Sequence, residues 1–240
     1  MPLDKLTIIG AGLLGGSIGL AARARGLARR VSTLVRRPES LAECQALGIA
    51  NEVTLDPAEA VAGADLVVLC TPISGMAGLA KRTLPDLKPG TVITDVGSTK
   101  QQLVAELTPL CARAGARFVG SHPMAGSDQT GPSAARADLF DGTVCVVTPT
   151  SDTDADALAT VNDFWADLGS RPVVMPADTH DRLVARCSHL PHLLASALAG
   201  RVLDPAHGEQ QAQLCATGFR DMTRLAAGSP VMWRDIVGSN

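Results

Sequence analysis

Several features that would assign this chain to a special class of protein are missing from its sequence. The six cysteines include no C-x-x-C pair, which argues against a zinc ribbon or a disulfide framework and favours free thiols in a reducing compartment. No apolar run approaches the roughly 20 residues that a membrane-spanning helix needs. The first residues, MPLDKLTIIGAG, lack the basic segment and cleavage site of a signal peptide. We therefore expect a cytoplasmic protein with no membrane association.

A strong charge of either sign is also missing. The net charge is -3 at pH 7, and 19% of the residues are charged while 46% are hydrophobic, as is usual for compact domains. This balance gives no reason to expect nucleic acid as a partner. At 240 residues the chain has room for one large and one small domain.

Short runs rich in valine and isoleucine recur along the first three quarters of the chain. They read LTIIG, VSTLV, DLVVLC, TVITDV, ARFVG, TVCVVT and RPVVM, and stretches rich in alanine and leucine separate most of them. This alternation predicts an α/β fold, a parallel sheet with helices on both faces. After Pro176 no β-branched run remains, and residues 178–199 and 209–227 are predicted to be helical. We expect a first domain of residues 1–175 and a smaller all-helical domain of residues 176–240.

A glycine motif follows the first of these strands. Gly10, Gly12 and Gly15 have G-x-G-x-x-G spacing at the head of an amphipathic helix. The first glycine permits a tight turn, the second lets the backbone approach a pyrophosphate, and the third lets helix pack on strand. The motif predicts a Rossmann-type dinucleotide-binding domain, with Leu13 and Leu14 in the same site.

Two arginines follow the second strand, where the choice between NAD and NADP is usually made. An acidic residue there binds the ribose 2′-hydroxyl of NAD, whereas arginine pairs with the 2′-phosphate of NADP. Arg36 and Arg37 occupy this place, and no acid stands at the strand tip. The sequence therefore favours NADP over NAD, the alternative being two solvated arginines in a surface turn.

Later strand ends contribute to the same predicted crevice, because ligands of open α/β sheets bind at the carboxyl ends of the strands. One strand leaves Thr71 and Pro72 at this edge. The next brings Asp95, Gly97, Ser98 and Lys100. Ser98 is read either as a group of the site or as the N-cap of the helix that follows it.

A histidine lies in the next segment, GSHPMAGSDQTG. Its glycines and proline predict a loop, and the same topology directs His122 into the crevice near Ser98. The alternative is a structural or solvated histidine, which is the commoner role of a lone histidine in a loop.

The helical part carries a second set of polar residues. THDRLVARCSHLPHLLASAL contains His180, His189 and His192, with Pro191 inside the predicted helix. We expect no metal, because no acidic or cysteine ligand accompanies the H-x-x-H pair at a recognised spacing. Further on, Arg220 and Arg224 are four apart on one predicted helical face. They are read either as a clamp for a substrate carboxylate or as part of a surface ion pair with Asp221.

The blocks DVGSTK, GSHPMAGS, HDRLVARCSHLPHLLA and GFRDMTRLA, in this order after the glycine motif, resemble the prephenate/arogenate dehydrogenases of tyrosine biosynthesis. The resemblance covers essentially the whole chain. It implies a dinucleotide-binding domain, a helical domain that forms a homodimer, and an oxidative decarboxylation with NAD or NADP. Family members usually continue beyond MWRDIVGSN, so we expect either a chain truncated at its C-terminal end or a shortened dimer interface.

The resemblance also implies roles for single residues. His122 matches the histidine that accepts the proton of the ring hydroxyl, and Ser98 matches the serine that contacts this hydroxyl. His192 is similar to the histidine that orders the substrate pocket, with His189 beside it, and Arg224 matches the arginine that binds a substrate carboxylate. Prephenate and arogenate both remain open as substrates, and Asp128 is read either as a partner for the ammonium group of arogenate or as a loop residue in solvent. Two other functions also stay open: a non-catalytic NAD(P)-binding regulator, and another two-domain enzyme such as a 3-hydroxyacid dehydrogenase or an imine reductase.

Overall fold

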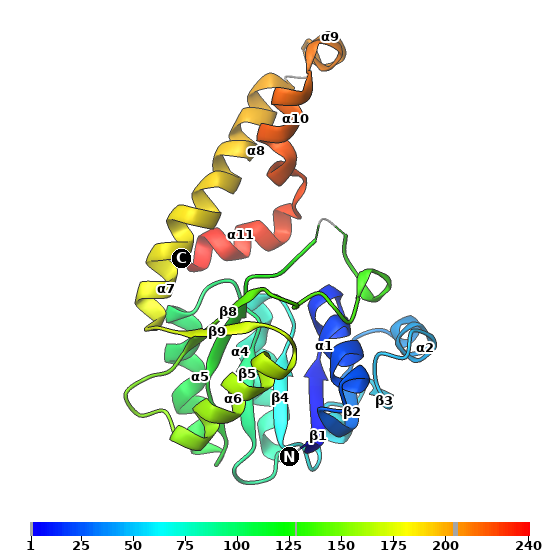
Figure 1. Ribbon diagram of the computed structural model, residues 1–240, viewed down its shortest axis with the longest axis vertical. Helices are drawn as coiled ribbons and strands as arrows, with labels where there is room; N and C mark the ends of the chain where they lie inside the picture. Colours follow the sequence, from blue (N-terminus) through cyan, green and yellow to red (C-terminus); the bar gives the residue numbers. More distant parts are fainter. Residues whose placement is uncertain (1, 128, 204–205) are drawn as a thin grey trace. The chain divides into compact units, whose positions relative to one another are not determined.

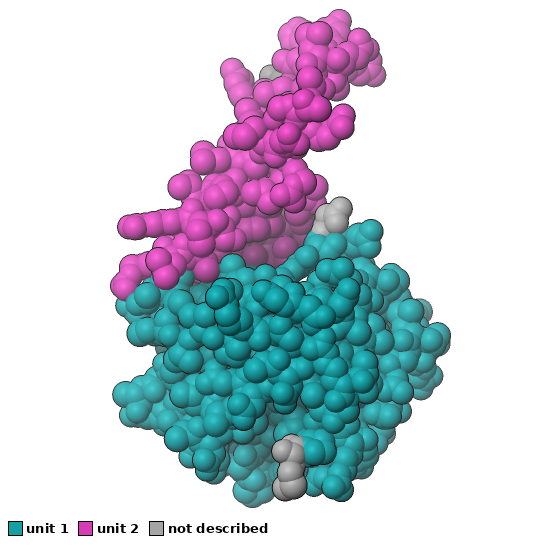
Figure 2. All heavy atoms as spheres, in the orientation of Figure 1, with its two compact units in different colours: residues 1–180 teal, residues 181–240 magenta. Residues whose placement is uncertain are grey.

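The structure is a computed structural model that describes residues 2–127, 129–203 and 206–240. The chain divides into two compact units, residues 1–180 and residues 181–240, which Figure 2 colours separately. Within the described residues, no helix has the length and apolar character needed to cross a membrane.

The first unit is built on a parallel sheet of six strands (Figure 1). In chain order its strands are β1 (Leu3–Ile9), β2 (Ala28–Leu34), β3 (Glu52–Thr54), β4 (Leu66–Leu69), β5 (Val92–Asp95) and β6 (Arg117–Phe118). Their order across the sheet is β3-β2-β1-β4-β5-β6. The order reverses between β1 and β4, which makes the carboxyl ends of these two strands the topological switch point where α/β folds bind ligands.

Helices cover both faces of this sheet, as the sequence predicted. They are α1 (Leu13–Ala24), α2 (Pro38–Ala46), α3 (Pro57–Val61), α4 (Ile73–Thr83), α5 (Gln101–Arg113) and α6 (Ala155–Asp167), with 3-10 turns at Leu84–Asp86 and Pro132–Ala134. Successive residues of β4 belong to different hydrophobic clusters: Leu66 and Val68 pack with α1, whereas Val67 and Leu69 pack with α4 and α5. Both sides of the strand are thus buried, which explains its continuous apolar run.

A second sheet of three strands corrects the prediction for the histidine segment. It consists of β7 (Gly120–Pro123), β8 (Val144–Thr148) and β9 (Arg171–Val174). β7 runs antiparallel to β8, and His122 is opposite Val146. The prediction of a loop at His122 was therefore wrong. Gly120 and Pro123 are the first and last residues of a short strand whose partner lies some 25 residues further along the chain. A larger residue would not fit at position 120, because a Cβ there would be 2.6 Å from Thr148 Oγ1.

The second unit is entirely helical in its described part. The chain forms α7 (Ala177–Val184), a π-helical turn (Ala185–His189), α8 (Leu190–Val202), α9 (Gly208–Leu214), α10 (Thr217–Thr223), a 3-10 turn (Arg224–Ala227) and α11 (Pro230–Ser239). The division between the units falls within α7. The predicted helix 178–199 is interrupted before Pro191, because proline has no N–H for the carbonyl four residues earlier. The π turn lets the helical path continue with the longer i to i+5 spacing.

Candidate functional site

The glycine motif forms a turn that requires glycine at two of its three positions. Gly10 follows β1 with a φ of 101°, and a Cβ there would lie 2.8 Å from the carbonyl oxygen of Cys70. A Cβ on Gly15 would overlap the carbonyl oxygen of Gly10. Gly12 is the N-cap of α1, and an added Cβ there would meet no atom within 4 Å. The turn thus brings α1 close to the sheet while leaving space at its N-terminus, where helix N–H groups bind phosphates.

The neighbouring residues fit a dinucleotide at this turn. Leu13 and Leu14 begin α1, and their half-buried side chains pack against the core. Thr71 and Pro72 follow β4, and Thr71 Cγ2 would lie 3.0 Å from a Cβ on Gly10. Among the described residues, the buried Oγ1 of Thr71 has no hydrogen-bond partner. A polar atom of this kind is normally satisfied, and a bound ligand would satisfy it here.

Arg36 and Arg37 lie where the sequence placed them, just beyond the end of β2. Both side chains are exposed, and Arg37 is the N-cap residue of α2. In the part of the chain that the structure describes, neither arginine is in an ion pair. Their guanidinium groups are therefore accessible to an anionic ligand, and also compatible with two solvated side chains.

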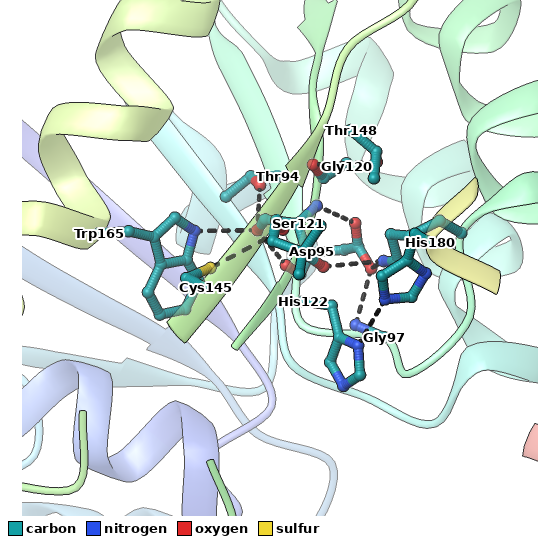
Figure 3. Close-up of polar contacts among 12 residues, drawn as sticks. Thr94, Asp95, Gly97, Gly120, Ser121, His122, Cys145, Thr148, Trp165 and His180 are labelled. Carbon is teal, nitrogen blue, oxygen red and sulfur yellow. Dashed lines mark hydrogen bonds and ion pairs between the residues drawn. The ribbon is translucent and has the colours of Figure 1, made fainter. Parts of the chain in front are cut away.

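A buried polar network joins the end of β5 to β7 (Figure 3). Asp95 forms an ion pair with Lys100, and neither side chain is exposed. Asp95 also accepts hydrogen bonds from the backbone N–H of Gly97 at 2.7 Å and of Ser121 at 3.0 Å. The ammonium group of Lys100 donates to the carbonyl oxygen of Ser121 at 2.8 Å. One ion pair therefore fixes both the turn before α5 and the strand residue that precedes His122.

The hydroxyl group of Ser121 completes this network. It donates to the carbonyl oxygen of Asp95 at 2.6 Å and accepts from Trp165 Nε1 at 2.9 Å. Thr94 Oγ1 lies 2.8 Å from the hydroxyl oxygen of Ser121. Because every partner is buried, β7 is held in one position by bonds to β5 and α6 as well as by its pairing with β8.

Ser98 and Gly97 lie in the turn that this network fixes. Ser98 is half-buried. The alternative reading of Ser98 as a helix N-cap is wrong, because α5 begins at Gln101 and its N-cap residue is Lys100. The chain between Gly97 and Gln101 instead forms a turn in which the Lys100 side chain reaches Asp95.

His122 is a buried strand residue with a histidine partner. Its side chain lies 2.8 Å from His180, measured between His122 Nδ1 and His180 Nε2. The ring centroids are 5.1 Å apart with an interplanar angle of 79°. His122 is 9% exposed and His180 is 1% exposed, so the two imidazoles form a closely packed pair (Figure 3). The sequence pointed to His122 but gave His180 no role, since a contact across 58 residues leaves no local pattern.

The second unit gathers two of the predicted substrate residues around a tryptophan. His192 stacks on Trp233 with centroids 3.4 Å apart and an interplanar angle of 12°. His189 meets the same indole edge-on at 5.9 Å, and its Nδ1 lies 3.2 Å from Asn240 Nδ2. Burial lowers the pKa of His192 below its ordinary value, which favours a neutral imidazole. Trp233 was missed in the sequence, where its presence as one of only two tryptophans was the available signal.

The predicted arginine clamp is on the surface of this unit. Arg220 belongs to α10, whereas Arg224 begins the 3-10 turn that follows it, and both side chains are exposed. Asp221 and Arg224 do not form an ion pair in the described ranges. The surface ion pair considered for these residues is therefore absent, and both guanidinium groups are available to a carboxylate.

The two sets of residues belong to different units. His122, Ser98 and the glycine motif lie in residues 1–180, whereas His189, His192 and the arginines lie in residues 181–240. A substrate site formed from both sets therefore stays a prediction. The structure has no group of three or more histidine, cysteine, aspartate or glutamate side chains that would hold a metal within residues 2–127, 129–203 and 206–240. Asp128 lies outside the described residues.

Known proteins resemble this chain over nearly its whole length. It is 36% identical over 237 residues to the cyclohexadienyl dehydrogenase of Zymomonas mobilis, covering 98% of this chain and 80% of that protein. The structure of Aquifex aeolicus prephenate dehydrogenase in complex with hydroxyphenyl propionate and NAD+ matches with a TM-score of 0.90 and 32% identity, over 98% of this chain and 82% of that one. Synechocystis arogenate dehydrogenase matches with a TM-score of 0.80 and 28% identity, over 98% and 86%. The chain spans 62% to 80% of the length of the curated relatives it matches.

Two family models together match most of the chain and leave residues 1–17 outside the match. The nucleotide-binding domain of prephenate dehydrogenase matches residues 18–174, and the dimerization domain of prephenate dehydrogenase matches residues 176–240. The buried histidine on β7 and the helical second unit lie within these matched segments, whereas the glycine turn precedes them. The chain therefore belongs to the prephenate dehydrogenase family.

Proposed function

We propose that this protein catalyses the NAD(P)-dependent oxidative decarboxylation of a cyclohexadienyl substrate, either prephenate to 4-hydroxyphenylpyruvate or arogenate to tyrosine. The observation that carries the proposal is the fixed, buried imidazole of His122 in the same unit as the dinucleotide turn. A nucleotide-binding protein without catalysis would not need a histidine held by a buried network of this kind. Membership of the family supplies the reaction class.

In the proposed reaction His122 is the proton acceptor. The substrate hydroxyl loses its proton to the imidazole, and Ser98 contacts the same hydroxyl group. Bound NAD(P)+ supplies the acceptor for the hydride that leaves the hydroxyl-bearing carbon. The bond to the ring carboxylate then breaks with release of carbon dioxide, its electron pair makes the ring aromatic, and the phenolate oxygen takes the proton back. A positioned general base is typically worth about 10² to 10⁴ in rate.

Substrate recognition is assigned to the second unit. Arg224, with Arg220 one helical turn before it, binds a substrate carboxylate through the planar guanidinium fork. His192 and His189, held by Trp233, order the pocket. A neutral His192 suits an apolar ring, since its lowered pKa keeps an additional positive charge out of the pocket.

The cofactor is assigned as NADP in preference to NAD on the basis of Arg36 and Arg37, which offer charged donors to a 2′-phosphate. Gly10, Gly12 and Gly15 would hold its pyrophosphate, and Leu13, Leu14, Thr71, Pro72 and Gly97 would line the rest of the site. We assign residues 1–175 to cofactor binding and residues 176–240 to substrate binding and to a homodimer interface. The protein is assigned to the cytoplasm.

The decisive experiment is a matrix of four assays in which prephenate and arogenate are each tested with NAD+ and NADP+, and reduction of the nicotinamide is followed. We expect turnover in at least one combination. We also expect His122→Asn to bind the cofactor as the wild type does while its kcat falls by about 10² to 10⁴. Cofactor binding without turnover of either substrate would identify a non-catalytic NAD(P)-binding protein instead, and near-normal kcat in His122→Asn would refute the assigned base.

A further inference from the structure

His180 Nε2 lies 2.8 Å from the Nδ1 atom of His122, the proposed base. It lies in α7, where its backbone N–H donates to the carbonyl oxygen of Pro176 at 3.0 Å. Its ring is 1% exposed. A buried imidazole in contact with a second imidazole has few orientations open to it, so the pair has a defined geometry and not merely a close approach.

We infer that His180 is a positioning residue that holds His122 in the tautomer with its proton on Nδ1. This inference rests on the proposed function of His122 as the base. Two neutral imidazoles joined by one hydrogen bond have two arrangements. In one, His122 Nδ1–H donates to His180 Nε2. In the other, His180 Nε2–H donates to His122 Nδ1, which places the proton of a neutral His122 on Nε2.

Only the first arrangement is compatible with a base. A neutral His122 with its proton on Nδ1 has a lone pair on Nε2, the nitrogen that must take the substrate proton because Nδ1 is engaged with His180. In the second arrangement Nε2 already carries a proton and His122 cannot accept another there. The partner of Nδ1 therefore decides whether His122 is active as a base.

The first arrangement also suits the charged state that follows proton transfer. A protonated His122 donates from both nitrogens, so the bond to His180 Nε2 is kept without any rotation of the rings. In this arrangement His180 Nε2 accepts the hydrogen bond both before and after the transfer. Other titratable groups lie in the surrounding network. Asp95 and Lys100 form an ion pair with each other. Burial raises the pKa of the Cys145 thiol on β8, which keeps this thiol protonated.

Nitrogen NMR on the histidine-labelled full-length protein measures the tautomer directly. The chain has only five histidines, and loss of one signal set in His122→Asn assigns the residue. At a pH where the ring is neutral, we expect the ¹⁵N shift of a protonated nitrogen at Nδ1 of His122 and that of an unprotonated nitrogen at Nε2. The reverse pattern would overturn the inference. This test needs no substrate, so it stands apart from the proposed function.

Kinetics of two variants test the consequence. His180→Phe keeps a ring of similar size but removes the acceptor, and we expect kcat to fall about 10- to 100-fold, as for other residues that orient a functional histidine, with KM for the cofactor unchanged. His180→Gln retains an acceptor and should recover most of the loss. The exposed His207 provides the control, His207→Gln, which should leave both kcat and its pH profile unchanged.

The outcomes separate the two claims. Wild-type kcat and an unshifted pH profile in His180→Phe would overturn the positioning role even if the protein turns over prephenate. If His180→Phe does not fold, the tautomer in the wild type and the recovery in His180→Gln decide. A wild type with the expected tautomer but no turnover of either substrate would support the histidine pairing and refute the proposed function.

Discussion

The carboxylate of Asp95 and the ammonium group of Lys100 form an ion pair with no exposed surface on either side chain. Burying two charges costs several kcal/mol per ion, which the pair offsets only with good geometry and further hydrogen bonds. Those bonds are present: the backbone N–H groups of Gly97 and Ser121 donate to Asp95, and Lys100 donates to the Ser121 carbonyl oxygen. The pair therefore joins two segments, each of which carries a predicted catalytic residue, Ser98 or His122.

Removing one member of this pair is predicted to be severely destabilising. Lys100→Met leaves the Asp95 carboxylate buried without its countercharge, a change that typically lowers the free energy of unfolding by about 3 to 5 kcal/mol. The measurement is denaturant unfolding followed by circular dichroism. We expect a lowered midpoint together with a lowered kcat, because the strand before His122 loses one of its attachments.

An exposed ion pair of the same chemistry provides the control. Lys81 and Glu106 lie 3.4 Å apart with side chains 58% and 46% exposed. Lys81→Met should change the free energy of unfolding by no more than about 1 kcal/mol, because exposed pairs are well solvated without their partner. Equal losses in Lys81→Met and Lys100→Met would show that burial is not what makes the Asp95 pair matter.

Two glycines of the nucleotide turn should respond differently to the same substitution. Gly15→Ala places a methyl group against the carbonyl oxygen of Gly10, and overpacking of this kind typically costs about 1 to 3 kcal/mol of stability. Gly12→Ala meets no protein atom within 4 Å. It should keep the stability of the wild type and raise the Kd for the cofactor about 10-fold or more, because the methyl group occupies the space at the N-terminus of α1. Thermal unfolding and cofactor titration by fluorescence distinguish the two effects, and equal stability losses would refute the distinction.

The sequence predicted those parts of the fold in which local pattern and burial agree. Continuous apolar runs marked β1, β4 and β5 because both faces of these strands are covered, and the fold class was confirmed. β3 was missed because three residues are too few to show a pattern. β7 was read as a loop since Gly120 and Pro123 are turn formers, whereas its strand geometry comes from pairing with β8, which no local pattern records.

The site shows the same division between local and non-local information. The glycine turn could be derived from spacing, because strand, turn and helix are adjacent in the chain. Asp95 and Lys100 are only five residues apart, yet their ion pair forms only because the turn between them brings the two side chains together. The sequence pattern does not show the shape of this turn. The contact of His122 with His180 and the stack of His192 on Trp233 link distant residues. Pattern analysis named three of these four residues without being able to pair them.

Arg36 is predicted to set the cofactor preference. Arg36→Asp replaces a donor to the 2′-phosphate with an acceptor for the ribose 2′-hydroxyl. A hydrogen bond to a charged group contributes about 1.5 to 3 kcal/mol, so the ratio of kcat/KM for NADP to that for NAD should fall about 10- to 100-fold. Arg29→Asp makes the same charge change near the start of β2, where Arg29 is exposed, and should leave the ratio unchanged. If the ratio of kcat/KM for NADP to that for NAD did not change in Arg36→Asp, both arginines would be solvated surface residues with no part in cofactor choice.

The stability of the protein should decrease as the pH falls below about 6.5, through His192. Burial lowers the pKa of this imidazole from its ordinary value of 6.5. The unfolded chain therefore binds a proton at a higher pH than the folded chain does, and protonation favours unfolding. The contribution of His192 to the free energy of unfolding is complete above pH 6.5 and is lost as the pH falls through its lowered pKa.

His192→Phe keeps an aromatic ring against Trp233 without a titrating group, so the free energy of unfolding of this variant should depend less on pH between 7.5 and 5. Denaturant unfolding at a fixed protein concentration measures both profiles, with His207→Gln as the control. Parallel profiles for the wild type and His192→Phe would contradict the assignment, since the lost stability would then arise from other groups.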